Sequence, residues 1–125
     1  EKKLNKDSSI VFTSSINRNK CSYIGSTIYA ASKGMLTGFM KASALELASK
    51  QIRVNCIEPG MVGTNLLNNS SSISNEDLEL DKSKYPLKRY GKPEEIAWAA
   101  VYLLSNASAW ITGTSLVIDG GYTLQ

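Results

Sequence analysis

Short apolar runs bounded by polar or turn residues recur along the chain and predict three β-strands. The runs cover Ser9–Ser14, Gln51–Ile57 and Ser115–Ile118, and each contains β-branched residues. Runs of this length without strict alternation are typical of strands buried on both faces of a parallel sheet. Turn residues close the second and third runs, since Pro59-Gly60 follows one and Asp119-Gly120-Gly121 follows the other.

Two longer segments between these runs have helical character. Residues Thr27–Leu47 contain only three charged side chains, and their apolar positions cover more than one narrow stripe. Such a pattern predicts a helix enclosed on most sides, by the sheet and by another subunit. A second helix opens at Gly91–Glu95, with a proline near its first position and acidic residues in its first turn, and continues through Ile96–Leu104.

The order strand, helix, strand, helix, strand predicts an α/β fold. A short helix-to-strand connection favours parallel strands joined by right-handed crossovers. The length of 125 residues suits one such domain with a real core. The polar segment Asn65–Tyr85 interrupts the order with a run of serines and four acidic residues. An insertion of this length is expected to be a mobile lid or disordered.

Composition and charge argue against several classes of function. The net charge of +3 is spread along the chain without a basic block, which gives no reason to expect a nucleic-acid partner. Two cysteines and no histidine provide neither a disulfide framework nor a zinc-binding pattern, so we expect no metal. No apolar run reaches the ~18 residues that span a bilayer, and the first residues do not resemble a signal peptide. We therefore expect a cytoplasmic protein without a membrane partner.

A tyrosine and a lysine in the first predicted helix form a candidate catalytic pair. Tyr29 and Lys33 are four residues apart, so a helix brings both side chains to one face. An ammonium held close to a phenol favours the phenolate and brings the tyrosine pKa toward the range of proton exchange at neutral pH. The spacing alone is weak evidence, because an ordinary half-buried tyrosine beside a solvated lysine has the same pattern. In a helix with so few charges, an embedded Lys33 requires a reason, since burial of an unpaired ammonium is costly.

Six segments together resemble the short-chain dehydrogenase/reductase family. They occur in the family's order and span nearly the whole chain, and the ending with Asp119-Gly120-Gly121 resembles the subgroup of 3-oxoacyl-[acyl-carrier-protein] reductases and many sugar or polyol dehydrogenases. The matching segments are Ile10–Ser15, Tyr29–Lys33, Ile52–Gly60, Thr64, Gly91–Ala97 and Thr112–Gly121. The resemblance implies a Rossmann-like parallel sheet with helices on both faces, of which this chain would be the C-terminal half.

The resemblance also implies an activity and roles for individual residues. Members transfer hydride between a nicotinamide cofactor, NAD or NADP, and the carbonyl or alcohol carbon of a small molecule. By match, Tyr29 would be the acid/base, and Lys33 would lower its pKa and hold the nicotinamide ribose. A serine at the strand end would hydrogen-bond the substrate oxygen. We expect this serine to be Ser15, with a one-residue insertion in the loop that follows, and Ser14 is the alternative.

The turn after the second strand would contact the nicotinamide carboxamide. Pro59, Gly60, Val62 and Thr64 match the family here, and the backbone of Val62 and the hydroxyl of Thr64 are the candidate contacts. A plain turn after a strand would contain the same residues. The segment 65–85 would be the substrate lid, and the intact protein would be a homo-oligomer, a dimer or tetramer.

The first half of the family pattern has no counterpart in this sequence. No G-x-G-x-x-G-type stretch for the cofactor pyrophosphate occurs. We therefore expect a fragment, or one half of a split protein that a partner chain completes, with poor cofactor binding by the chain alone. Another interpretation is a protein of this fold that has lost catalysis and serves as a binding module. The presence of both Tyr29 and Lys33 argues against it.

Overall fold

A three-stranded parallel β-sheet forms the centre of the protein. The computed structural model describes residues 5–20, 24–64 and 74–125. Strands β1 (Ser9–Thr13), β2 (Arg53–Pro59) and β3 (Ser115–Ile118) lie in that order across the sheet, with β2 in the middle. Both pairings are parallel, so all three strands end at the same edge of the sheet. The α/β architecture expected from the sequence is confirmed.

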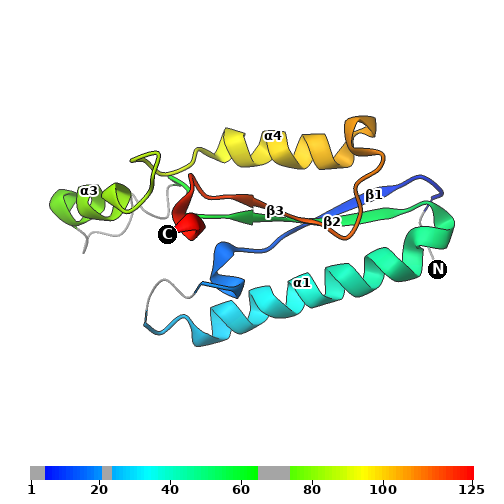
Figure 1. The fold of residues 1–125 in the computed structure, drawn as a ribbon, viewed down its shortest axis with the longest axis horizontal. Helices are drawn as coiled ribbons and strands as arrows, with labels where there is room; N and C mark the ends of the chain where they lie inside the picture. The colour runs from blue at the N-terminus through cyan, green and yellow to red at the C-terminus, as the bar shows by residue number, and fades with distance from the viewer. Residues whose placement is uncertain (1–4, 21–23, 65–73) are drawn as a thin grey trace.

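Helices cover both faces of this sheet. In Figure 1, α1 (Thr27–Leu47) runs below the sheet and α4 (Pro93–Leu104) above it. A further helix, α3 (Asn75–Ser83), lies beyond the edge at which the strands end. Short 3-10 turns are η1 (Ile16–Arg18), η2 (Ala48–Lys50), η3 (Asn106–Ser108) and η4 (Tyr122–Leu124). Within the described ranges, none of the helices is long and apolar enough to cross a bilayer.

The hydrophobic core lies between α1 and the middle of the sheet. Met40 and Ala44 of α1 pack with Ile52, Val54 and Cys56 in and just before β2, and all five are buried. Burial of one large aliphatic side chain stabilises a fold by about 1.5–3 kcal/mol. Residues 54–58 of β2 are buried because the strand has a neighbour on each side and a helix over each face. The absence of charged residues from Val54 to Ile57 follows from this central position.

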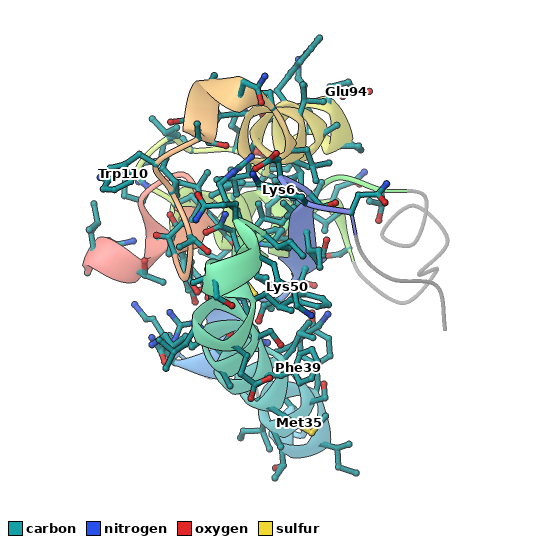
Figure 2. All side chains as sticks on the ribbon, turned by 90° about the vertical axis from the view of Figure 1, so that its right-hand side faces the viewer. Lys6, Met35, Phe39, Lys50, Glu94 and Trp110 are labelled. Atoms are coloured by element: carbon teal, nitrogen blue, oxygen red, sulfur yellow. The ribbon has the colours of Figure 1, made fainter. Side chains whose placement is uncertain are left out.

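One flank of α1 is exposed, contrary to the expectation of a helix enclosed on most sides. Met35 and Phe39 are 73% and 58% exposed, and Figure 2 shows both projecting from the same flank. The sheet covers only the face that carries Met40 and Ala44, and the described part of the chain provides no second cover. The ring of Phe39 also meets Phe12 of β1 edge to face, with centroids 5.7 Å apart. The exposed flank therefore adjoins β1.

The polar segment expected to form a lid contains the helix α3. Its start is capped by Ser74, whose hydroxyl oxygen accepts a hydrogen bond from Asp77 N at 3.1 Å. Glu76 and Asp77 occupy the first turn, where the helix dipole favours acidic residues. A serine three positions before an acidic residue is a sequence signal for a helix start, and the expectation of a lid did not use it. The rest of the predicted lid, residues 65–73, lies outside the described ranges.

β1 is an edge strand of the described sheet. It pairs with β2 on one side, and no described residue pairs with it on the other. Its residues Ser9–Phe12 are half-buried. An unpaired edge with apolar side chains can accept a further strand.

Candidate active site

The three strands bring distant parts of the chain together at one edge of the sheet. β1 is followed by Ser14-Ser15, β2 by Gly60 and β3 by Asp119. Helix α1 begins near this edge and runs back along the sheet (Figure 1). Its first two turns carry Tyr29 and Lys33. In open α/β sheets, ligands bind outside the carboxyl ends of the strands, so this edge is the candidate site.

Tyr29 and Lys33 form a pair on one face of α1. The Lys33 ammonium lies over the Tyr29 ring, 5.5 Å from its centroid, within the range of a cation–π contact. The same ammonium donates a hydrogen bond to the carbonyl oxygen of Thr13, the last residue of β1, at 3.0 Å. Tyr29 is 43% exposed, so a ligand can reach its side chain. The structure thus brings the two residues together at the carboxyl edge.

The two serines after β1 are held in different ways. The Ser14 hydroxyl donates to the Lys33 carbonyl oxygen at 3.0 Å and lies 3.2 Å from Thr37 Oγ1, so it fastens the end of β1 to α1. The Ser15 hydroxyl oxygen instead accepts a hydrogen bond from Asn17 N at 3.2 Å, as the N-cap of η1. That bond leaves the Ser15 hydroxyl hydrogen to donate elsewhere. The Ser14 hydroxyl therefore donates within the fold, whereas the Ser15 hydroxyl still has a hydrogen to donate.

The turn after β2 is fastened on two sides. Gly60 N donates to Ile118 O at 3.0 Å, which extends the ladder between β2 and β3. The backbone of Met61–Gly63 forms a parallel bridge with Gly91 through two hydrogen bonds of 2.9 and 3.0 Å. Thr64 follows the bridge with an exposed side chain. Val62 therefore lies within the segment tethered to Gly91, and Thr64 follows directly after that segment.

Gly60 lies in close contact with the residue that follows β3. A Cβ added there would lie 3.0 Å from Asp119 Cβ and 3.4 Å from the Tyr85 ring, so a side chain does not fit without a shift. Asp119 accepts hydrogen bonds from Gly121 N, Thr123 N and Thr123 Oγ1 at 2.7 to 2.9 Å. Burial acts to raise the pKa of the Asp119 carboxyl, but the hydrogen bonds from Thr123 and Gly121 outweigh it and lower the pKa. The turn after β3 is therefore held by its own carboxylate.

An ion pair at the start of α4 holds the segment that contains Gly91. The Arg89 guanidinium binds both carboxylate oxygens of Glu95 at 2.7 and 2.8 Å, and Lys92 N donates to the same carboxylate at 2.8 Å. The bond from Arg89, followed by that from Lys92, lowers the pKa of Glu95 to about 2. Sequence reasoning identified Glu95 only as a residue of the first helical turn. Its link to Gly91 and Met61–Gly63 was missed because it depends on the tertiary fold.

The chain matches proteins of one family along almost its whole length. A family model described as enoyl-(acyl carrier protein) reductase matches residues 1–123. The crystal structure of a short-chain dehydrogenase family protein from Francisella tularensis subsp. tularensis SCHU S4 is 39% identical, with a TM-score of 0.86 over 98% of this chain and 53% of that chain. The chain belongs to the short-chain dehydrogenase/reductase family.

Two further members of the short-chain dehydrogenase/reductase family are similar to the chain. The 3-oxoacyl-[acyl-carrier-protein] reductase FabG of Chlamydia muridarum is 49% identical over 98 residues, which are 78% of this chain and 38% of that protein. A blue fluorescent protein from a metagenomic library, solved in complex with NADPH, is 28% identical, with a TM-score of 0.84 over 95% of this chain and 47% of that chain. The chain thus spans about half, or less, of the relatives it matches. The resemblance to 3-oxoacyl-[acyl-carrier-protein] reductases is confirmed.

Replacement of Glu95 by glutamine is expected to loosen the bridge between Gly91 and Met61–Gly63, because it removes the charge that Arg89 binds. The Gly63 amide should exchange with solvent about tenfold faster near neutral pH in a hydrogen-exchange measurement. Because the ion pair lowers the pKa of Glu95, the stabilisation that the ion pair gives is fully present above pH 4.5, the ordinary pKa of a glutamate. This stabilisation is lost as the pH falls toward about 2.

The matched control for this experiment is Glu94→Gln. Glu94 lies in the same helical turn but outside the ion pair, so its replacement removes an equal charge from the helix start. The control should leave Gly63 exchange unchanged. Equal exchange rates in the two variants would contradict a specific role for the contacts of Glu95 with Arg89 and Lys92.

Proposed function

We propose that this chain provides the proton-transfer half of an NAD(P)-dependent oxidoreductase that acts on a carbonyl or a secondary alcohol. The observation that carries the proposal is the Tyr29–Lys33 pair, whose ammonium is anchored to the end of β1. A phenol beside a fixed cation at the carboxyl edge of a parallel sheet is suited to exchange a proton with a substrate oxygen. The FabG relative supports 3-oxoacyl thioesters as the first substrates to test.

In the proposed reduction, three side chains act around one substrate oxygen. A bound nicotinamide supplies the hydride that the carbonyl carbon receives. Tyr29 donates its hydroxyl proton to the carbonyl oxygen, so that the C=O double bond becomes the C–OH of an alcohol. The Ser15 hydroxyl donates a hydrogen bond to the same oxygen and stabilises the negative charge that develops there. Lys33 holds Tyr29 in place and stabilises the phenolate that remains.

The residues of this chain fit the nicotinamide end of a dinucleotide. The Lys33 ammonium has three N–H donors, and Thr13 O accepts one of them, which leaves donors for ribose hydroxyls. The tethered backbone of Val62 and the exposed residue Thr64 follow the turn Pro59-Gly60 and would contact the carboxamide. The NADPH bound by the metagenomic blue fluorescent protein supports NADP as the preferred form. A comparison of rates with NADH and NADPH decides the preference.

We further propose that catalysis requires a complementary nucleotide-binding half, in the same polypeptide or in a second chain. Two observations support this requirement: the relatives are about two or more times as long as the matched region, and no described residue pairs with the outer edge of β1. The edge adjoins the exposed flank of α1 through the contact between Phe12 and Phe39, so one partner can cover both. This chain together with that half is called the assembled enzyme below. In it, α3 would belong to the substrate lid.

The assembled enzyme is also proposed to be a homo-oligomer, with α4 at an interface. Trp98, Val101 and Tyr102 are exposed and share one flank of α4 by their spacing. Exposed aromatic and aliphatic side chains in such a group are typical of protein interfaces.

The variant Trp98→Glu is expected to reduce the mass of the assembled enzyme in sedimentation equilibrium, because a buried, unpaired carboxylate opposes association. Trp110→Glu is the matched control. Trp110 is fully exposed, and Figure 2 shows it at the periphery, away from α4, so this variant should keep the full mass. An unchanged mass with Trp98→Glu would remove α4 from the interface.

Tyr29→Phe is expected to lower kcat of the assembled enzyme by about 10²–10⁴-fold, because it removes the proton donor. Hydride transfer is followed by the absorbance of the reduced nicotinamide with a 3-oxoacyl thioester and a panel of other carbonyls. Tyr122→Phe is the control, since it removes a phenol hydroxyl from η4 and should leave kcat unchanged. Full turnover by Tyr29→Phe would overturn the assignment.

Single replacements of the two serines separate their roles. Ser15→Ala should lower kcat by about 10²-fold, as the loss of one donor to a developing oxyanion does elsewhere. It should also lower the free energy of unfolding by about 1 kcal/mol, because the N-cap bond to Asn17 N is lost. Ser14→Ala should lower the free energy of unfolding by about 1 kcal/mol, because its buried bond to the Lys33 carbonyl is lost. Urea unfolding and steady-state kinetics measure both effects. The reverse outcome, with kcat sensitive to Ser14 and not to Ser15, would assign the substrate contact to Ser14.

A further inference from the structure

A buried ion pair joins the Ser15 turn to the end of β2. Arg18, the last residue of η1, pairs through Nε with Oε1 of Glu58, and the two side chains are only 19% and 2% exposed. Glu58 directly precedes Pro59-Gly60 in the chain. The pair therefore connects the segment that carries the proposed oxyanion donor to the strand end that carries the nicotinamide turn.

Stability alone is a poor explanation for this pair. Removal of two charges from water is costly, and well-packed apolar residues often give equal or greater stability at such positions. Residues Val54–Ile57 of β2 are also buried, and they contain no charge. Glu58 is thus the one charged side chain among the buried residues of β2. Unlike an apolar residue, the Glu58 carboxylate fixes the direction of the Arg18 side chain.

The Ser15 turn requires such an anchor because the strand ladder stops just before it. Ser14 N donates to Ile57 O at 2.8 Å, and the chain then leaves the sheet. Within η1, Ser15 O accepts a hydrogen bond from Arg18 N at 3.2 Å, and Ser15 Oγ accepts one from Asn17 N at 3.2 Å. One short turn therefore connects the Ser15 hydroxyl to Arg18. A displacement of Arg18 displaces that hydroxyl.

We propose that Arg18 and Glu58 are positioning residues whose ion pair holds the Ser15 hydroxyl in register with Tyr29. Without the pair, η1 moves relative to α1, and the two groups no longer meet on one substrate oxygen. The inference rests on the proposed function for its catalytic consequence, whereas the positioning of Ser15 can be measured independently of activity.

The test is the double replacement Arg18→Met with Glu58→Met in the assembled enzyme. Two apolar side chains leave no buried charge unpaired, so the thermal unfolding midpoint is expected to stay close to that of the unsubstituted enzyme. In contrast, kcat should fall about 100-fold, since a misplacement of about 1 Å costs that much. KM for the carbonyl substrate should change by less than about twofold, because the contact strengthens in the transition state. Arg18→Lys keeps the charge, and it should lose only about tenfold in kcat.

Hydrogen exchange of the Asn17 amide gives a readout that does not depend on activity. This amide donates to Ser15 Oγ, so its exchange should be about tenfold faster in the double variant if η1 is released. Arg53→Met is the control. Arg53 is a half-buried arginine at the other end of β2 that donates to Leu103 O and Ser108 Oγ at 2.9 Å. Its loss should lower the unfolding midpoint yet leave kcat and Asn17 exchange unchanged.

The outcomes separate the two proposals. Unchanged Asn17 exchange in the double variant overturns the positioning role, whether or not kcat falls. Faster Asn17 exchange with unchanged kcat also overturns it, because the turn then moves without effect on catalysis. If the unsubstituted assembled enzyme transfers no hydride, the proposed function fails, and Asn17 exchange alone then decides whether the ion pair positions Ser15.

Discussion

The hydrogen bond from the Lys33 ammonium to the Thr13 carbonyl connects helix, strand end and catalytic candidate in a single contact. The core packing of Met40 and Ala44 fixes the later turns of α1 against the sheet, but the first turns have an exposed flank. Those turns are held instead by polar contacts with the end of β1, from Lys33 and from the Ser14 hydroxyl. The position of Tyr29 therefore depends on directional bonds, which define geometry more sharply than apolar contact does.

Local patterns in the sequence were sufficient for the three strands and for α1 and α4, whereas the helix α3 was not predicted. The bounds of α1 and β3 agree with the expected ranges, because each has a distinct pattern and Asp119-Gly120-Gly121 closes β3. The second strand starts two residues later than expected, since Gln51 adopts a left-handed conformation (φ 57°) that ends η2. The apolar run continued across this turn, so composition alone did not mark it.

The site was only partly accessible to sequence reasoning. The Tyr29–Lys33 pair follows from helical spacing, and the serine pair from its place at a strand end. The contacts that hold the Ser15 turn and the turn after β2 depend on residues distant in sequence, namely Glu58 beside Arg18 and Gly91 beside Met61–Gly63. No local pattern predicts such pairs. The exposed flank of α1 illustrates the same limit, because its apolar residues indicated burial without identifying what covers them.

The close approach at Gly60 has a consequence for attempts to alter this protein. The backbone there lies against Asp119, whose carboxylate organises the chain after β3, and against Tyr85, which stacks on Tyr122 with ring centroids 4.7 Å apart. A methyl group at position 60 would press on both neighbours and transmit the strain to the C-terminal segment. Substitutions meant to alter this turn are therefore better placed at Met61 or Thr64, whose side chains are exposed, than at the glycine.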